Sequence, residues 1–239
     1  MDAKYEELFR LKVLDYTCYD FLAPHGVLDV FQDVAGKHAT QYDMTFEQLL
    51  EKNMIWVLVK VKYRVIKNIP LYSKVKVTTW PKKKGLVDFD RETLITTVDG
   101  DVLIEGISKW VVVDINTRKI IPAKYVSYNA ICPDDSLFDE KFTKIEDIDI
   151  NDANHYQCKV EFCDVDHNNH TNNAKYACMI LNALRLKKEN DIKEFEINFV
   201  NETILDDVID LYYKKIDNYY IVKAISNNKI VFTSKVSVN

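Results

Sequence analysis

The chain has 239 residues, of which 47% are hydrophobic, and it carries a formal net charge of −5. This hydrophobic content is enough for a packed core, in one large domain or two small ones, and it excludes a disordered chain. The longest apolar runs, such as residues 55–59, are far shorter than the roughly 20 residues that cross a bilayer. The N-terminus has scattered charges and the pattern of neither a signal nor a transit peptide, so we expect a cytoplasmic protein without a membrane span.

Charge is unevenly distributed along the chain. Every charged residue from Lys52 to Lys84 is basic, whereas acidic residues gather between Asp134 and Asp152. The overall acidity argues against nucleic acid as the main ligand, because nucleic-acid sites are strongly basic. The basic stretch allows two interpretations with equal weight. It is either a face that attracts an acidic partner through a field that salt screens, or a solvated strand face with lysine at alternate positions.

The cysteines are odd in number, widely spaced and without a CxxC pair: Cys18, Cys132, Cys158, Cys163 and Cys178. This spacing favours reduced thiols over a disulfide framework or a zinc ribbon. We expect them to fill the core.

The first half of the chain predicts a helix followed by strands. Residues 28–52 place apolar side chains such as Phe31, Val34 and Ala35 three and four positions apart, which predicts one long helix, broken near Asp43. Residues 55–65 then alternate apolar and basic side chains, as a half-buried strand does. The same alternation recurs, between turn signals, in residues 74–80, 87–98 and 102–115. We therefore expect a helix and an antiparallel meander.

The second half repeats this order. A strand over residues 156–162, a helix over residues 172–188 and four strand-like runs follow an Asp-rich connection without periodicity. We expect an N-terminal unit of residues 1–130, a linker of residues 131–153 and a C-terminal unit of residues 154–239. A helix wrapped by an antiparallel sheet is a hotdog. The predicted fold is therefore an α+β double hotdog, two tandem units forming one continuous sheet.

One dense polar cluster, FCDVDHNNHTNN, separates a strand from a helix in the second half. Thr171 or Asn172 can cap that helix, and the free N–H groups of its first turn would suit an oxyanion. His170 beside them can act as a general base or a donor, with Asp166 and Asn168 fixing its position. The alternative is that these residues only form a turn and cap a helix, as they often do.

A metal site is a rival use of the same cluster, because His167 and His170 lie three apart and Asp164 and Asp166 are close. The two histidines would share a face only if the intervening residues were helical, and their composition is that of a turn. We predict no metal and no cofactor.

The segment DVDHNNHTNNAKY resembles the motif DxDxNxHxNNxxY of the acyl-acyl-carrier-protein thioesterases, which also ends in a helix. The TTWP segment and the order of elements resemble the same family along nearly the whole chain. The resemblance implies a hydrolase that releases free fatty acid from an acyl thioester. It places the catalytic network on Asp166, Asn168 and His170, with a glutamate after the second helix that maps to Glu202.

The resemblance has one departure. Where plant members carry cysteine, this sequence has Thr203, so a thiolate nucleophile is not expected at that position. Cys163 is the nearest other thiol in sequence, and we interpret it as a buried, inert one. We expect water to attack the thioester carbonyl, with Glu202 or His170 as the base. N–H groups near Asn172 and Asn173 would hold the oxyanion.

The implied substrate is an acyl chain on the phosphopantetheine of an acidic acyl carrier protein, in fatty acid biosynthesis, and the basic stretch offers a means of docking that partner. In this family the acyl chain lies in the N-terminal hotdog, so Val34, His38, Trp56 and Val59 are candidate lining residues. Hotdog sheets pair readily, so a homodimer is allowed.

Two other functions stay open. An acyl-CoA thioesterase would use the same fold and residues on a nucleotide-bearing substrate. A non-catalytic lipid-binding hotdog protein would be expected to lack Glu202, His170 or Asn168, and the sequence retains all three.

Overall fold

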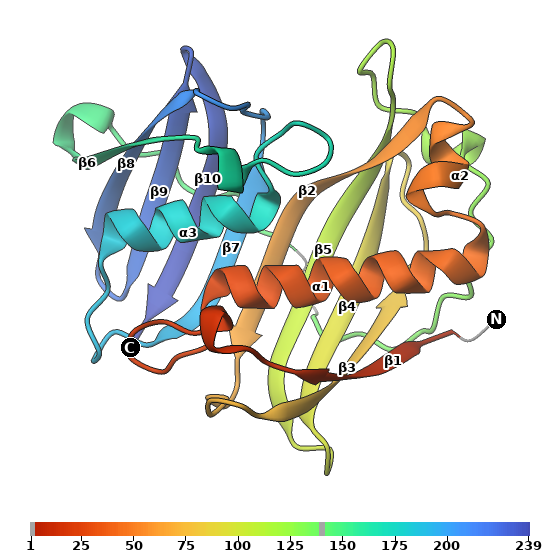
Figure 1. The fold of residues 1–239 in the computed structure, drawn as a ribbon, viewed down its shortest axis with the longest axis horizontal. Coiled ribbons are helices and arrows are strands. Elements are labelled where there is room, and N and C mark those ends of the chain that lie inside the picture. The colour runs from red at the N-terminus through yellow and green to blue at the C-terminus, as the bar shows by residue number, and fades with distance from the viewer. Residues whose placement is uncertain (1–2, 139–141) are drawn as a thin grey trace.

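The computed structural model describes residues 3–138 and 142–239, which form one ten-stranded antiparallel sheet with its main helices on one face (Figure 1). The N-terminal half contains β1 (Tyr5–Arg10), α1 (Pro24–Ala39), α2 (Phe46–Leu50), β2 (Met54–Val65), β3 (Lys74–Pro81), β4 (Asp88–Thr97) and β5 (Val102–Asp114). The C-terminal half contains β6 (Asn154–Lys159), α3 (Asn173–Leu184), β7 (Ile192–Phe199), β8 (Val208–Ile216), β9 (Tyr219–Ser226) and β10 (Lys229–Val238).

The strand order shows that the two halves have one topology. The order is β1-β3-β4-β5-β2-β7-β10-β9-β8-β6, so the halves meet at β2 and β7. Moving outward from that seam, each half places its second strand first, then its fifth, fourth, third and first. The double hotdog with one continuous sheet is therefore confirmed.

The expected meander is only partly correct. Strands β3, β4 and β5 follow one another, but β2 lies beyond β5 and pairs with β5 and β7. The simple alternation along β2 is wrong as well, because the register with β5 shifts between Leu58 and Lys60. A bulge adds one residue and moves the following side chains to the other face. Leu58, Val61 and Tyr63 are consequently the buried apolar residues of this strand, and Lys62 is buried as well.

Helix α1 begins with Pro24 in its first turn, where no intrahelical N–H is needed, and buries one apolar stripe. The predicted break near Asp43 is confirmed, since Asp43 has φ of 55° and separates α1 from α2. The helix lies close to the sheet at Gly106. A Cβ there would lie 2.1 Å from Cε2 of Phe31, so this position on β5 needs glycine.

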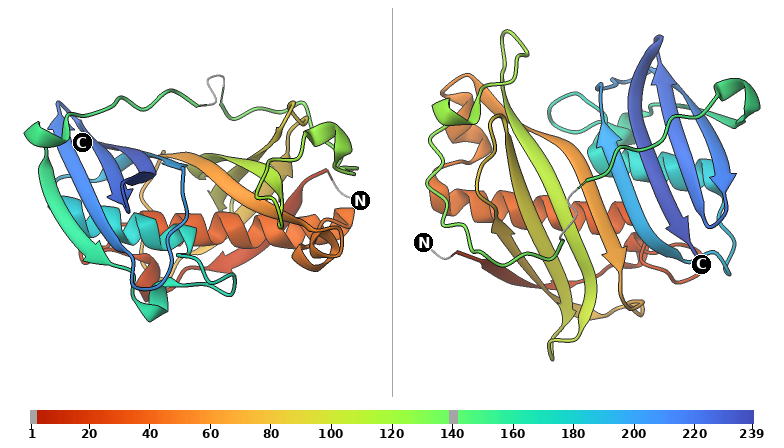
Figure 2. Two further views of the ribbon diagram at one scale, coloured as in Figure 1. Left: turned by 90° about the horizontal axis from the view of Figure 1, so that it is seen from above. Right: turned by 180° about the vertical axis from the view of Figure 1, so that it is seen from behind.

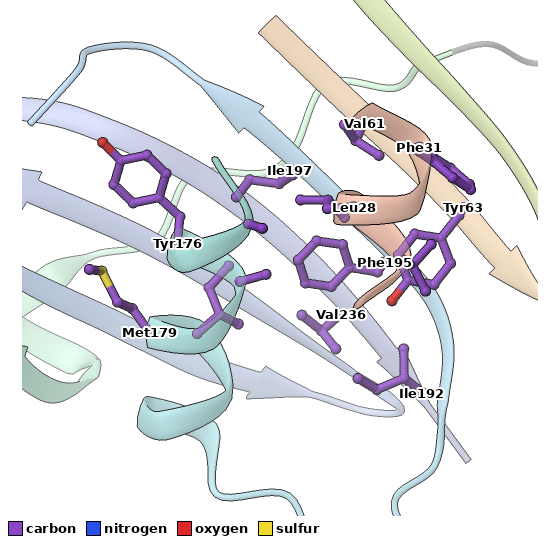
Figure 3. Packing of buried hydrophobic residues seen from close by; sticks show 14 of the residues in the cluster. Leu28, Phe31, Val61, Tyr63, Tyr176, Met179, Ile192, Phe195, Ile197 and Val236 are labelled. Atoms are coloured by element: carbon purple, nitrogen blue, oxygen red, sulfur yellow. The ribbon is translucent and has the colours of Figure 1, made fainter. Parts of the chain in front are cut away.

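The two halves share one hydrophobic core beneath α1 and α3. Phe31 from α1 packs edge-on to Tyr63 of β2, whose ring stacks on Phe195 of β7 at 5.6 Å between centroids (Figure 3). Ile197 is fully buried in the same cluster. Burial of each such side chain stabilises the fold by about 1.5–3 kcal/mol, so the seam between the halves is firmly packed.

Residues 115–138 and 142–153, between the two halves, lie across the sheet face that the helices leave open (Figure 2). Phe138 and Ile145 are buried there, and the ring of Phe142 lies 5.6 Å from Nζ of Lys60. The division into units at residues 131–153 stays a prediction. In the described ranges, no helix is long and apolar enough to cross a membrane.

Candidate active site

The polar cluster forms a tight loop between β6 and α3. The N–H of Asp166 donates to the carbonyl of His170 at 2.9 Å, and Asn169 between them adopts φ of 63°. Asn172 is the N-cap of α3, since its side-chain oxygen accepts from the N–H of Ala174 at 2.9 Å. The loop therefore presents its side chains above the first turn of α3, where backbone N–H groups have no acceptor within the helix.

Asp166 holds the loop through the backbone. Its Oδ1 accepts a hydrogen bond from the N–H of Asn168 at 2.8 Å, which fixes the turn that carries Asn168 and His170. Asp166 is half-buried and Asn168 is exposed.

Glu202 follows β7 and meets His170 across the cleft. Nε2 of His170 lies 3.2 Å from Oε2 of Glu202, although 32 positions separate the two residues in the chain. The guanidinium of Arg118 donates from Nη2 to the same oxygen. The structure thus brings His170 and Glu202 together.

Arg118 is a residue that the sequence reasoning missed. It lies in the turn after β5, in the N-terminal half, 84 positions from Glu202. A single arginine in a turn carries no local signal of a partner so distant, and only the pairing of β2 with β7 brings this turn to the site.

Thr203 lies beneath the site and is buried. Its hydroxyl is 2.7 Å from that of Thr171 and 2.9 Å from that of Tyr176, and its N–H donates to the Tyr176 oxygen at 3.1 Å. Desolvation by burial raises the pKa of Tyr176, so its hydroxyl stays protonated and able to donate. These hydrogen bonds join the His170 loop to the Glu202 segment from below.

The side chains of the loop and of the Glu202 segment line one cavity of about 540 Å³, which we call the polar cavity. Thr203 is not part of its lining. Its wall includes the expected residues Asp166, Asn168, His170, Glu202, Asn172, Asn173, Trp56 and Val59, together with Arg118.

A second, mainly apolar cavity of about 370 Å³ lies under the N-terminal half, between α1, α2 and the sheet. Gln32, Trp56 and Trp110 line both cavities, so the two adjoin at these side chains. Phe89 and Met44 form part of its apolar wall. We call it the apolar cavity.

Val34 and His38, expected as substrate-lining residues, lie elsewhere. Neither lines the polar or the apolar cavity. Val34 is fully buried in the core because it falls on the sheet-facing stripe of α1. His38 is also buried, and its ring nitrogens are 2.8 Å from the Tyr42 hydroxyl and 3.0 Å from Nη1 of Arg91. His38 therefore helps to fix the side chain of Arg91, and Arg91 lines the apolar cavity.

The two histidines of the metal hypothesis have different partners. His170 faces Glu202, whereas the ring of His167 contacts that of Phe46 edge-on at 5.3 Å between centroids. Within the described residues, no three His, Cys, Asp or Glu side chains converge as metal ligands would.

The basic stretch from Lys52 to Lys84 is not an open basic face. Most of its cations form ion pairs: Lys62–Glu194, Arg64–Glu105, Lys67–Asp101, Lys76–Glu6, Lys82–Glu92 and Lys83–Asp134. The sequence could not show this, because the acidic partners come from neighbouring strands and from the linker. The stretch therefore has fewer unpaired cations than the sequence suggested, and its role in docking stays a prediction.

The cysteines also differ from expectation. Cys18 and Cys163 are exposed, and the other three are partly buried, so these thiols do not simply fill the core. Cys163 does not line the polar cavity. It lies in the short 3-10 helix Phe162–Asp164 before the loop and is exposed, so the expectation of a buried thiol is wrong.

Solved structures with this arrangement define the class of fold. The acyl-ACP thioesterase from Bacteroides thetaiotaomicron superposes with a TM-score of 0.90 at 22% identity, over 99% of this chain and 98% of that one. The 12:0-ACP thioesterase from Umbellularia californica superposes with a TM-score of 0.89 at 16% identity, over 100% and 98% of the two chains. The chain has their double-hotdog fold.

The family follows from the sequence. Residues 2–125 match the acyl-ACP thioesterase N-terminal domain and residues 145–238 match the acyl-ACP thioesterase C-terminal domain. The palmitoyl-acyl carrier protein thioesterase of Gossypium hirsutum is 26% identical over 173 residues, 68% of this chain and 41% of that protein. The chain belongs to the acyl-ACP thioesterase family, and it spans less than half the length of the Gossypium protein and of two Cuphea viscosissima relatives.

Proposed function

We propose that this protein hydrolyses the thioester of fatty acyl-acyl-carrier-protein to free fatty acid and carrier protein. One observation carries the proposal: the His170–Glu202 pair lies in a polar cavity that adjoins an apolar cavity at Gln32, Trp56 and Trp110. A thioester at the boundary would have its acyl chain in the apolar cavity and its carbonyl near the pair. Such an arrangement suits an amphiphilic substrate.

In the proposed reaction Glu202 is the base. His170 and Arg118 both contact Oε2 of Glu202, which leaves Oε1 as the oxygen outside these two ion pairs. Oε1 takes a proton from water, the water oxygen attacks the thioester carbon, and the carbonyl oxygen becomes an oxyanion. The N–H of Asn173, in the first turn of α3, stabilises that oxyanion, whereas the N–H of Asn172, also expected for this role, donates to the carbonyl of Asp164 at 2.8 Å. The C–S bond then breaks as the oxyanion re-forms the carbonyl, and Glu202 returns its proton to the leaving thiolate.

Asp166 and Asn168 have supporting roles in this scheme. Asp166 fixes the loop through the N–H of Asn168, as the 2.8 Å hydrogen bond supports. The Asn168 side chain, which lines the polar cavity, orients the water or the carbonyl. No thiol is needed, because Thr203 is bonded to Thr171 and Tyr176 and Cys163 lies outside the cavity.

The carrier protein is proposed as the partner because the matched relatives are named for acyl carrier protein substrates. A cytoplasmic location and a homodimer stay predictions. The paired lysines of the basic stretch leave the docking surface to be found by measurement, through the salt dependence of the rate.

The test is thiol release from acyl-carrier-protein and acyl-CoA thioesters of several chain lengths, at low and moderate salt. Glu202→Gln keeps the shape of the side chain and removes the base, so hydrolysis should fall by about 10²–10⁴-fold. The matched control is Asn68→Ala, because Asn68 follows β2 as Glu202 follows β7 and lies outside both cavities. Its rate should equal that of the wild type.

Each other outcome points elsewhere. A preference for acyl-CoA that is independent of salt would indicate the acyl-CoA thioesterase. Binding of acyl chains without hydrolysis of any thioester would indicate a lipid-binding protein. Full activity of the Glu202→Gln variant would refute the proposed base.

A further inference from the structure

The centre is built from both halves of the chain through Arg118. Glu202 and His170 belong to the C-terminal half, whereas Arg118 follows β5 of the N-terminal half. Arg118 and His170 contact the same carboxylate oxygen, Oε2 of Glu202. Glu202 is therefore held from two sides by groups that different segments supply.

The turn that carries Arg118 is fixed by its own hydrogen bonds. Oδ1 of Asp114 accepts from the N–H groups of Asn116 and Thr117, at 3.1 and 2.7 Å, and the N–H of Arg118 donates to the Asp114 carbonyl at 2.8 Å. The hydrogen bonds from Thr117 lower the pKa of Asp114, which keeps its carboxylate ionised and able to accept them. Arg118 itself has φ of 57°, an unusual value for a residue with a side chain. The turn thus fixes the backbone position from which the guanidinium reaches Glu202.

The ion pair is too open to be explained by stability. The side chains of Arg118 and Glu202 are 47% and 39% exposed, and pairs this exposed contribute little to folding. Their contact instead adds to that of His170 in restricting the rotation of the Glu202 carboxylate. With Oε2 occupied by Arg118 and His170, Oε1 is the oxygen left to receive a proton from water.

We infer that Arg118 is a positioning residue that fixes the Glu202 carboxylate, so that one oxygen faces His170 and the other faces the attacking water. This inference rests on the proposed function for its consequence in catalysis. A small misplacement of a reacting group costs up to about 10²-fold in rate, so the effect of losing Arg118 should be large in kcat.

The experiment compares Arg118→Ala, Arg118→Lys and the control Lys119→Ala, the neighbouring exposed cation in the same turn. The substrate is an acyl-N-acetylcysteamine thioester, which carries no charge and so removes any effect on docking of an anionic partner. Arg118→Ala should lose about 10–100-fold in kcat with KM within about twofold. Lysine should restore part of the rate, because the contact uses a single oxygen, and millimolar guanidinium should rescue the alanine variant. Lys119→Ala should match the wild type.

A second readout does not depend on activity. The imidazole ¹H–¹⁵N signals of His170, assigned with a His170→Gln variant, should change in Arg118→Ala and not in Lys119→Ala. Unchanged signals, or an unchanged kcat, would overturn the inference. An inactive wild type with changed signals would instead refute the proposed function and keep the positioning role.

Discussion

The two halves contain the same loop with different side chains. In the N-terminal half the N–H of Thr17 donates to the carbonyl of Phe21 at 2.8 Å, as Asp166 does to His170 at 2.9 Å. Each loop is closed by an isolated bridge, and each has one residue of positive φ, 62° at Asp20 and 63° in the other loop. Thr17, Tyr19 and Phe21 thus stand where Asp166, Asn168 and His170 stand.

The segments after β2 and β7 correspond as well. The N–H groups of Ile66 and Lys67 donate to the carbonyl of Leu103, and those of Val200 and Asn201 donate to the carbonyl of Val231. When the two halves are aligned on these hydrogen bonds, Asn68 corresponds to Glu202 and Ile69 corresponds to Thr203.

The comparison teaches that backbone geometry alone does not make the site. The N-terminal loop also borders a cavity, of about 250 Å³, but Thr17, Tyr19 and Phe21 supply no base to it. Both halves of the double hotdog contain this loop, whereas the acid, amide and imidazole side chains of Asp166, Asn168 and His170 occur only in the second loop.

The largest difference between the loops should appear at His170. His170→Ala should lower thioester hydrolysis by about 10²–10⁴-fold, because the group facing Glu202 is lost. Phe21→Ala, the matched change in the other loop, should leave kcat within about twofold. Steady-state kinetics of both variants, with circular dichroism to confirm folding, makes the comparison. Equal losses in the two variants would contradict it.

Substitutions at the buried position below each loop should both lower stability but differ in their effect on activity. Thr203→Ile imports the side chain of Ile69 and leaves the hydroxyls of Thr171 and Tyr176 without this partner, at a cost of about 1–3 kcal/mol in unfolding free energy. The melting temperature should fall by about 2–4 °C for each kcal/mol. Hydrolysis should fall too, since the Glu202 segment loses its attachment.

The reverse change, Ile69→Thr, is the control for that prediction. It buries a hydroxyl in an apolar place and should cost about 1–3 kcal/mol of stability while leaving kcat unchanged. Urea unfolding and kinetics on both variants separate stability from activity. A loss of kcat in Ile69→Thr would show that the two halves are not independent in this respect.

A smaller effect is expected at Asp166. In the N-terminal loop the Thr17 hydroxyl accepts from the N–H of Tyr19 at 3.3 Å, in place of the carboxylate contact to Asn168 at 2.8 Å. Asp166→Thr should therefore keep the loop and lose about tenfold in kcat, since a charge-assisted hydrogen bond becomes a neutral one. A complete loss in a folded variant would mean that the carboxylate acts on the substrate itself.

The smallest effect concerns the thiols. Cys18 and Cys163 are exposed and should react quickly with a thiol reagent near pH 8. Burial raises the pKa of Cys158 to about 11, which lowers its thiolate fraction at that pH, so it should react slowly. Cys163→Ser should keep hydrolysis within about twofold, because the proposed mechanism uses no thiol. Mass spectrometry of labelled peptides and the rate of that variant test both points.

The sequence by itself determined most of the local structure of both halves. Strand patterns predicted the strands from β2 to β10, although not β1 or the bulge in β2. The stripe containing Phe31 predicted α1, and the loop ending at the Asn172 cap was predicted with its helix. These features depend on neighbours in the chain, which periodicity and capping chemistry report directly.

Only the tertiary structure decided which distant groups meet. The position of β2 beyond β5, the pairing of Arg118 with Glu202 and ion pairs of the basic stretch such as Arg64–Glu105 all depend on strand order and register. The environment of His38 also depends on tertiary packing, because its ring lies beside Arg91 and outside the lining of both cavities. Sequence patterns record the period of each element, whereas contacts across a sheet are set by how the elements pack together.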